Sequence, residues 1–228
     1  MRIGGLQKTT LLDFPGKVSA IVFTQGCNFT CPYCHNSELA AGRQEGLSQA
    51  GVMAFLEKRR NVLKGVVISG GEPTLHEGLS GFCASLKDLG YAVKLDTNGS
   101  RPEVLRELLM AGLLDYVAMD VKADPEDYPA AICSKATGGN VRRSMALLEE
   151  SGVRHEFRIP CVAPFIDTYS FAAILGHIRK ATLFLQAVRA ERVLQADFFA
   201  RQGRALDKNE MEILSRTAAQ KNVDCRLR

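Results

Sequence analysis

The sequence predicts an α/β fold in which short parallel strands alternate with amphipathic helices. Short apolar runs are each followed by a longer helical pattern, and this alternation recurs along the chain as six βα units. Six units are too few for the eight of a closed barrel, so we expect a partial, open (β/α)6 barrel with right-handed crossovers. With 228 residues the chain suits a single domain, residues 1–228, with a core at about 17–188 and a C-terminal extension at 189–228.

The boundaries of the elements follow from apolar runs, helix caps and turn residues. Residues 17–23 form an apolar run that predicts a buried strand. Ser48 is a suitable N-cap for the next helix, and Pro102 suits the first position of a later one. The other strands are expected at residues 65–69, 91–95, 116–119, 153–159 and 183–188, and the other helices at 77–89, 141–150, 168–180 and 208–220.

Composition excludes several classes of protein. The apolar content of 46% and the charged content of 24% are ordinary for a globular domain. The first twenty residues carry Lys8, Asp13 and Lys17 without a continuous apolar stretch, so we expect no signal peptide, no membrane partner and a cytoplasmic location. A net charge of +4, without a basic run interleaved with aromatic residues, does not indicate a nucleic-acid partner.

Three of the seven cysteines lie in the loop that follows the first apolar run. Cys27, Cys31 and Cys34 have the spacing C-x3-C-x2-C, and no fourth cysteine follows before Cys83. A closed zinc site needs four ligands, whereas a 4Fe–4S cluster on three thiolates keeps one iron open to a small molecule. The sequence therefore favours an iron–sulfur cluster, and a zinc site completed by His35 or a distant cysteine is the alternative.

Two further motifs follow the next two expected strands. Gly70-Gly71-Glu72-Pro73 comes after residues 65–69, and Asp96-Thr97-Asn98-Gly99 comes after residues 91–95. Each motif alone also fits a plain turn, because Gly pairs before Pro and Asn-Gly are common turn sequences. However, the carboxyl ends of parallel strands share one edge of a sheet, where functional residues collect. Glycines there allow close approach to a ligand, and Glu72 can accept a hydrogen bond from an ammonium group.

Together these motifs resemble a known family. Cys27, Cys31, Tyr33 and Cys34 are similar to the signature of the radical S-adenosylmethionine (SAM) superfamily. The continuation to Asn36 and the two later motifs narrow the resemblance to glycyl-radical-enzyme activases, in particular the activating proteins of anaerobic ribonucleoside-triphosphate reductase. The resemblance implies an oxidoreductase that reductively cleaves SAM to a 5′-deoxyadenosyl radical. That radical would remove a glycine hydrogen and so install a glycyl radical on the reductase.

The resemblance also implies cofactors and roles for individual residues. One 4Fe–4S cluster would be held by Cys27, Cys31 and Cys34, and SAM and a monovalent cation would bind beside it. The residues implied in binding SAM are Tyr33 and Asn36 at the nucleoside, Gly70, Gly71 and Glu72 at the amino group, and Lys122 and Arg158 as balancing charges. The residues implied at the cation are Asp96, Thr97 and Asp120. For Lys122 and Arg158, a simple ion pair is an equal alternative.

The expected partners are a glycyl radical enzyme as protein substrate and flavodoxin or ferredoxin as reductant. Residues 11–17 depart from the Asp-Gly-Pro-Gly version seen in better-known activases, which favours a distinct subgroup. Two alternatives stay open from the sequence. The target could be another glycyl radical enzyme, such as a pyruvate formate-lyase type. The chain could instead be a non-catalytic iron–sulfur electron-transfer module, which would leave Glu72, Asp96 and Lys122 without a role.

Overall fold

The computed structural model describes residues 1–195 and 197–228, with the side chains of residues 135 and 136 outside the described set. The chain divides into two compact units, which are considered separately. The first unit contains Met1–Asn28, Glu38–Thr97 and Glu103–Val117, and the second contains Phe29–Ser37, Asn98–Pro102 and Ala118–Arg228. The cysteine loop therefore begins in the first unit and continues in the second.

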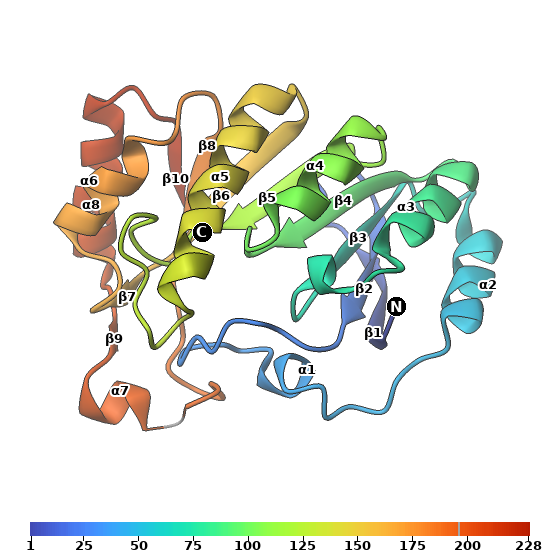
Figure 1. Ribbon diagram of the computed structural model, residues 1–228, viewed down its shortest axis with the longest axis horizontal. Helices are drawn as coiled ribbons and strands as arrows, with labels where there is room; N and C mark the ends of the chain where they lie inside the picture. Colours follow the sequence, from blue (N-terminus) through green and yellow to red (C-terminus); the bar gives the residue numbers. More distant parts are fainter. Residues whose placement is uncertain (196) are drawn as a thin grey trace. The chain divides into compact units, whose positions relative to one another are not determined.

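Parallel strands form the centre of the first unit. The strands β2 (Ser19–Thr24), β3 (Gly65–Gly70) and β4 (Ala92–Thr97) run parallel as neighbours, and β1 (Ile3–Thr10) pairs antiparallel with β2. Three helices accompany them, drawn in cyan to green in Figure 1: α2 (Gln49–Arg59), α3 (Leu79–Asp88) and α4 (Pro102–Met110). The short elements α1 (Ser37–Ala40) and η1 (Pro73–Leu75) follow β2 and β3 along the chain.

The core of the first unit explains why its strands are apolar throughout. Val66, Val67 and Ile68 are consecutive on β3, and all three are fully buried. Consecutive side chains of a strand point to opposite faces, so both faces of the sheet are covered here. This burial accounts for the continuous apolar runs from which the strands were predicted.

The second unit has its own parallel strands. The strand β8 (Thr182–Gln186) lies between β6 (Arg154–Pro160) and β10 (Cys225–Leu227), and all three run parallel. The short strands β7 (Val162–Ala163) and β9 (Arg204–Ala205) form an antiparallel pair. Its helices are α5 (Lys135–Ser151), α6 (Thr168–Leu175), α7 (Phe198–Arg201) and α8 (Lys208–Gln220), of which α6 and α8 lie side by side (Figure 1). The strand β5 (Tyr116–Asp120) leads the chain from the first unit into the second.

The α/β class with parallel strands is confirmed, and several elements differ from the expected ones. Strand β1 was not expected, because IGGLQKTT has no apolar run. Helix α5 starts at Lys135 instead of residue 141, since the Ser134 side chain accepts the N–H of Thr137 at its N-terminus. Helix α6 ends at Leu175 instead of residue 180, and Gly176 follows it. Strand β10 follows the last of the expected helices and was not expected. Within the described ranges, no helix is long and apolar enough to cross a bilayer.

A buried glutamate on α5 holds the turn that enters β8. Glu149 is 6% exposed, and its carboxylate accepts the N–H groups of Arg179 (3.1 Å) and Lys180 (2.9 Å). A hydrogen bond to a charged group contributes more than a neutral one, and an unpaired buried N–H is costly. This side chain therefore fixes the path of the chain between α6 and β8.

Replacing Glu149 by Ala should lower the free energy of unfolding by about 2–3 kcal/mol, because the turn amides lose their acceptor. The measurement is chemical denaturation of the full chain. Its neighbour Glu150 is exposed, so Glu150→Ala is the matched control and should change the stability by less than about 0.5 kcal/mol. Equal unfolding midpoints for the two variants would contradict the role given to Glu149.

Candidate functional site

The three cysteines of the loop are divided between the two units. Cys27 belongs to the first unit, is half-buried, and donates its N–H to the carbonyl of Ala40 (3.1 Å). Cys31 and Cys34 belong to the second unit, where the N–H of Cys34 donates to the carbonyl of Cys31 (3.0 Å) in a tight turn. In the described part of the chain, no three His, Cys, Asp or Glu side chains form a ready-made metal group. Convergence of the three thiolates on one cluster therefore stays a prediction.

Two glycines at the end of β3 allow another backbone segment to approach. A Cβ on Gly71 would lie 2.0 Å from the carbonyl oxygen of Gly26, and a Cβ on Gly70 would lie 2.3 Å from the nitrogen of Thr24. Gly70 also has a φ of +118°, which L side chains rarely adopt. The contact brings the N–H of Glu72 to the Gly26 carbonyl (2.8 Å), directly before Cys27. The glycines thus position the start of the cysteine loop. Their contact with SAM stays a prediction.

Glu72 joins two of the predicted motifs in the first unit. Its side chain is fully buried, and Oε1 accepts hydrogen bonds from the N–H and hydroxyl of Thr74 (3.1 and 2.5 Å) and from the hydroxyl of Thr97 (2.7 Å). A buried carboxylate is expensive to desolvate, and such bonds offset that cost. The structure therefore brings Glu72 and Thr97 together, as the shared edge of parallel strands predicted.

Asp96 has a charged partner that the sequence analysis missed. The ammonium of Lys94, whose side chain is fully buried, forms an ion pair with Oδ1 of Asp96. The two residues are both on β4, two positions apart, so their side chains point to the same face. The spacing of two residues could have indicated this ion pair from the sequence. Lys94 lies inside an apolar run, however, and such a run predicts only a buried strand.

In the second unit, two distant segments hold the cysteine loop. The N–H and hydroxyl of Thr30 donate to the carbonyls of Ile132 (2.9 Å) and Ala131 (3.0 Å). On the other side of Cys31, the carbonyl of Pro32 accepts the N–H of Gln195 (3.0 Å). The C-terminal extension therefore contacts the loop directly.

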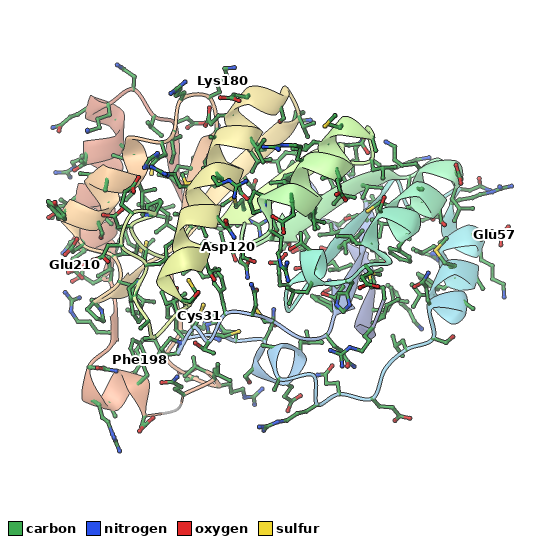
Figure 2. The ribbon with its side chains drawn as sticks, in the orientation of Figure 1. Cys31, Glu57, Asp120, Lys180, Phe198 and Glu210 are labelled. Carbon is green, nitrogen blue, oxygen red and sulfur yellow. The ribbon has the colours of Figure 1, made fainter. Side chains whose placement is uncertain are left out.

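An aromatic cluster extends this contact. The ring of Phe165 lies 5.7 Å from that of Tyr33, and Phe198 of α7 stacks on Phe165 with ring centroids 5.6 Å apart and an interplanar angle of 9°. Burial, together with the nearby Cys31, raises the pKa of the Tyr33 hydroxyl well above its ordinary value. That hydroxyl is buried and has no hydrogen-bond partner among the described residues. Figure 2 shows Cys31 and Phe198 at the same end of the second unit.

Asp120 and Lys122 form an ion pair at the end of β5. The Lys122 ammonium lies 2.9 Å from Oδ2 of Asp120, and the backbone N–H of Lys122 donates to the hydroxyl of Tyr128 (2.8 Å). Burial alone would lower the pKa of Lys122, but the carboxylate of Asp120 and the Cys31 thiol outweigh it and raise the pKa. The ammonium therefore stays charged.

Arg158 also has a partner on its own strand. Its Nε donates to Oε1 of the buried Glu156 (2.7 Å), so the structure contains the ion pair that was the alternative for this residue. The side chain of Asn36 is exposed. For both residues, contact with SAM stays a prediction.

A cavity in the second unit lies away from these residues. It has a volume of about 290 Å³, lies between α5 and the turn after α6, and is lined by Arg142, Arg143, Ala146, Glu149, Glu150, Gly176, His177 and Arg179. In Figure 2, Lys180 beside this turn and Cys31 are at opposite ends of the unit. The cavity includes none of the predicted site residues and is not the candidate site.

Comparison with known sequences identifies relatives of the chain. The family model of the radical SAM superfamily matches residues 21–166, more than half of the chain. A Methanocaldococcus jannaschii protein assigned as a glycyl-radical enzyme activating enzyme is 31% identical over 72% of this chain and 68% of its own length. The pyruvate formate-lyase-activating enzyme of Clostridium pasteurianum is 29% identical over 78% of this chain and 76% of its own length.

Solved structures share the fold. SuiB of Streptococcus suis, in a crystal structure with S-adenosylmethionine, superposes with a TM-score of 0.65 at 12% identity, over 91% of this chain and 49% of that chain. Native anSMEcpe with bound AdoMet gives a TM-score of 0.56 at 19% identity, over 71% of this chain and 48% of that chain. At these identities the likeness concerns the fold alone.

Gly71→Ala should displace the backbone at Gly26, because the added Cβ would overlap the carbonyl oxygen there. We expect a loss of stability of more than about 1 kcal/mol and less iron bound after anaerobic reconstitution. Melting temperature and iron content test this. The matched control is Gly81→Ala in α3, where a Cβ meets nothing within 4 Å and should stabilise the helix slightly. Full iron content in Gly71→Ala would contradict the positioning role.

Phe198→Ala should loosen the second-unit part of the cysteine loop, since it removes the ring stacked on Phe165. Large-to-small changes of a buried Phe cost about 3–5 kcal/mol, and we expect faster loss of iron from the reconstituted protein in air. Denaturation and iron release measure the two effects. Tyr169→Ala is the control, because that ring is 82% exposed. If Phe198→Ala is destabilised but releases iron at the wild-type rate, Phe198 contributes to folding and the role given to it in supporting the cysteine loop is contradicted.

The residues present fit the cofactors that the family implies, one 4Fe–4S cluster and SAM. Three thiols in one short loop suit three irons. The buried Tyr33 hydroxyl and the buried carboxylate of Glu72 offer polar atoms of the kind that a ligand with amino and hydroxyl groups requires. The prediction of a radical SAM enzyme is confirmed by the match over residues 21–166 and by the assigned activase from M. jannaschii. The chain belongs to the radical SAM superfamily, and within it to the glycyl-radical enzyme activating enzymes.

Proposed function

We propose that this enzyme installs a glycyl radical on anaerobic ribonucleoside-triphosphate reductase. The observation that carries the proposal is the cysteine loop Cys27-x3-Cys31-x2-Cys34 in a chain of this family. The narrower choice of target rests on the resemblance of the motifs around Asn36, Glu72 and Asp96 to those of the activating proteins of that reductase.

In this proposal Cys27, Cys31 and Cys34 bind three irons of one 4Fe–4S cluster and leave the fourth without a protein ligand. Tyr33 and Asn36 contact the nucleoside of SAM. Gly70, Gly71 and Glu72 contact its amino group. For Glu72, the hydrogen bonds from Thr74 and Thr97 would fix the orientation of the carboxylate. Such a carboxylate can accept a hydrogen bond from an ammonium group.

When bound, and with one electron from the reductant, the cluster and SAM would supply the radical chemistry that removes a hydrogen atom from a glycine Cα of the partner. The protein's own contribution is to bind, orient and shield, and no side chain is needed as acid or base. Lys122 and Arg158 would place positive charge near carboxylates without adding a proton donor to the reaction. The aromatic cluster of Tyr33, Phe165 and Phe198 would keep water away from one side of the cysteine loop.

A second target has support of its own. The relative from Clostridium pasteurianum is named as a pyruvate formate-lyase-activating enzyme, and the match covers 76% of its length. An activase of a pyruvate formate-lyase type would use the same residues around the cluster and differ in the surface that meets the partner. We propose flavodoxin or ferredoxin as the reductant and the cytoplasm as the location in either case.

Cys34→Ala should abolish both the 4Fe–4S absorbance and the formation of 5′-deoxyadenosine after anaerobic reconstitution, because two thiolates do not hold the cluster. Cys83→Ala is the matched control. Cys83 is fully buried in α3, outside the cysteine loop, so its variant should keep both properties. A Cys34→Ala protein with activity would overturn the cluster assignment.

The target is tested with the reconstituted wild type, dithionite, SAM and each candidate partner. A glycyl radical seen by electron paramagnetic resonance on anaerobic ribonucleoside-triphosphate reductase, and not on pyruvate formate-lyase, supports the proposal. The reverse result favours the second target. Nucleoside formation without a radical on either protein would overturn both, and a clustered protein that forms no nucleoside would return the electron-transfer alternative.

A further inference from the structure

A buried lysine lies next to one of the predicted cofactor-binding residues. The side chain of Lys94 is fully buried, whereas that of its ion-pair partner Asp96 is 18% exposed. The Lys94 ammonium also lies 5.8 Å from the centre of the Tyr116 ring, within the range of a cation–π contact. An ammonium that is completely removed from water is costly, and it persists only where it is paired.

The position of this ammonium is set by the strand itself. Lys94 and Asp96 point to the same face of β4 because they are two residues apart. On the neighbouring strand, Val67 is paired with Lys94 and Ile68 with Leu95, and both are fully buried. The aliphatic part of Lys94 thus lies in the core, and its ammonium group reaches the carboxylate of Asp96 near the end of the strand.

We infer that Lys94 is a built-in counter-cation for Asp96, so that this site needs no monovalent metal ion from solution. The inference rests on the proposed function, and on the place beside SAM that the resemblance implies for Asp96. An ammonium at ion-pair distance supplies the charge that a bound cation would supply to the carboxylate. Because it is covalently attached, it is present at any salt concentration. Lys94 is therefore a positioning residue, which acts on the cofactor through Asp96.

The second unit repeats this arrangement independently. Asp120, the other carboxylate expected at the cation, is paired with Lys122 at 2.9 Å, again at a spacing of two residues. Each of the two predicted cation ligands with a carboxylate thus has its own lysine. This pairing is the observation on which the inference rests.

The first test uses the reconstituted wild-type protein. SAM binding and 5′-deoxyadenosine formation are measured in choline chloride, with K⁺, Na⁺ or NH₄⁺ replacing choline at constant ionic strength. We expect both quantities to change less than about twofold over the whole range, because the charge at Asp96 is supplied from within. Stimulation of the wild type by about tenfold or more by K⁺ or Na⁺ would overturn the inference.

The second test removes the ammonium. Lys94→Met keeps an unbranched apolar side chain, one atom shorter than that of lysine, and leaves Asp96 without this cation. We expect SAM affinity to fall by about tenfold or more in choline and to recover on addition of K⁺ or NH₄⁺. A merely structural role would not produce recovery by small cations. The matched control is Lys87→Met, which removes an exposed ion pair with Asp115 on the same unit and should leave SAM affinity independent of cations.

The outcomes separate the inference from the proposed function. Nucleoside formation by the wild type only with added K⁺ would keep the function and overturn the role of Lys94. Nucleoside formation with no cation effect in the wild type and rescue of Lys94→Met supports both. Circular dichroism shows whether Lys94→Met folds. If it does not, the role of Lys94 is decided by the SAM affinities of Lys94→Arg and of the wild type, both of which should be the same with and without added cations. The absence of nucleoside in every salt would overturn the proposed function, while the SAM-binding titration still decides the role of Lys94.

Discussion

The hydrogen bonds to Glu72 are the constraint on which the first unit's part of the site depends. A fully buried carboxylate has to be compensated, and here Thr74 and Thr97 provide the compensation from two different segments. The same residue donates its N–H to Gly26, so that the turn after β3, the end of β4 and the start of the cysteine loop share one anchor. Each of these segments can be fixed only if the others are in place.

The rest of the cysteine loop depends on segments that are remote in sequence. Thr30 is bound by the carbonyls of residues 131 and 132, and Pro32 is bound by Gln195. Stacking of Phe198 on Phe165, and the contact of Phe165 with Tyr33, add apolar contact to these few bonds. The loop has no regular secondary structure, so tertiary contacts supply the rigidity that a ligand-binding loop needs.

Local signals explain what the sequence predicts well. Ser48 and Pro102 begin helices where they stand, because capping and the fixed φ of proline act within one turn. The apolar strands were found since burial on both faces leaves a continuous run. The motif residues Glu72 and Thr97 were expected at one edge, and they meet there. Each of these inferences needs only the order of residues and the rule that parallel strands share an edge.

The sequence does not reveal contacts between residues far apart in the chain, or polar residues that lie within an apolar run. Strand β1 is polar and rich in glycine, and it exists because β2 offers it an edge. Lys94 was hidden in an apolar run, although its spacing to Asp96 would have indicated the ion pair. The contact of Gln195 with Pro32 has no signature in either segment, so residues 189–228 could not be assigned a role.

That last contact has a consequence for synthesis on the ribosome. The cysteine loop leaves the exit tunnel early, whereas Gln195 and Phe198 follow only after the helices α2 to α6 have been made. Domains fold as units during translation, and the second unit lacks part of its loop support until Gln195 and Phe198 have emerged. Delivery of iron and sulfide to the cysteines during elongation would therefore meet a loop that lacks the contacts of Gln195 and Phe198.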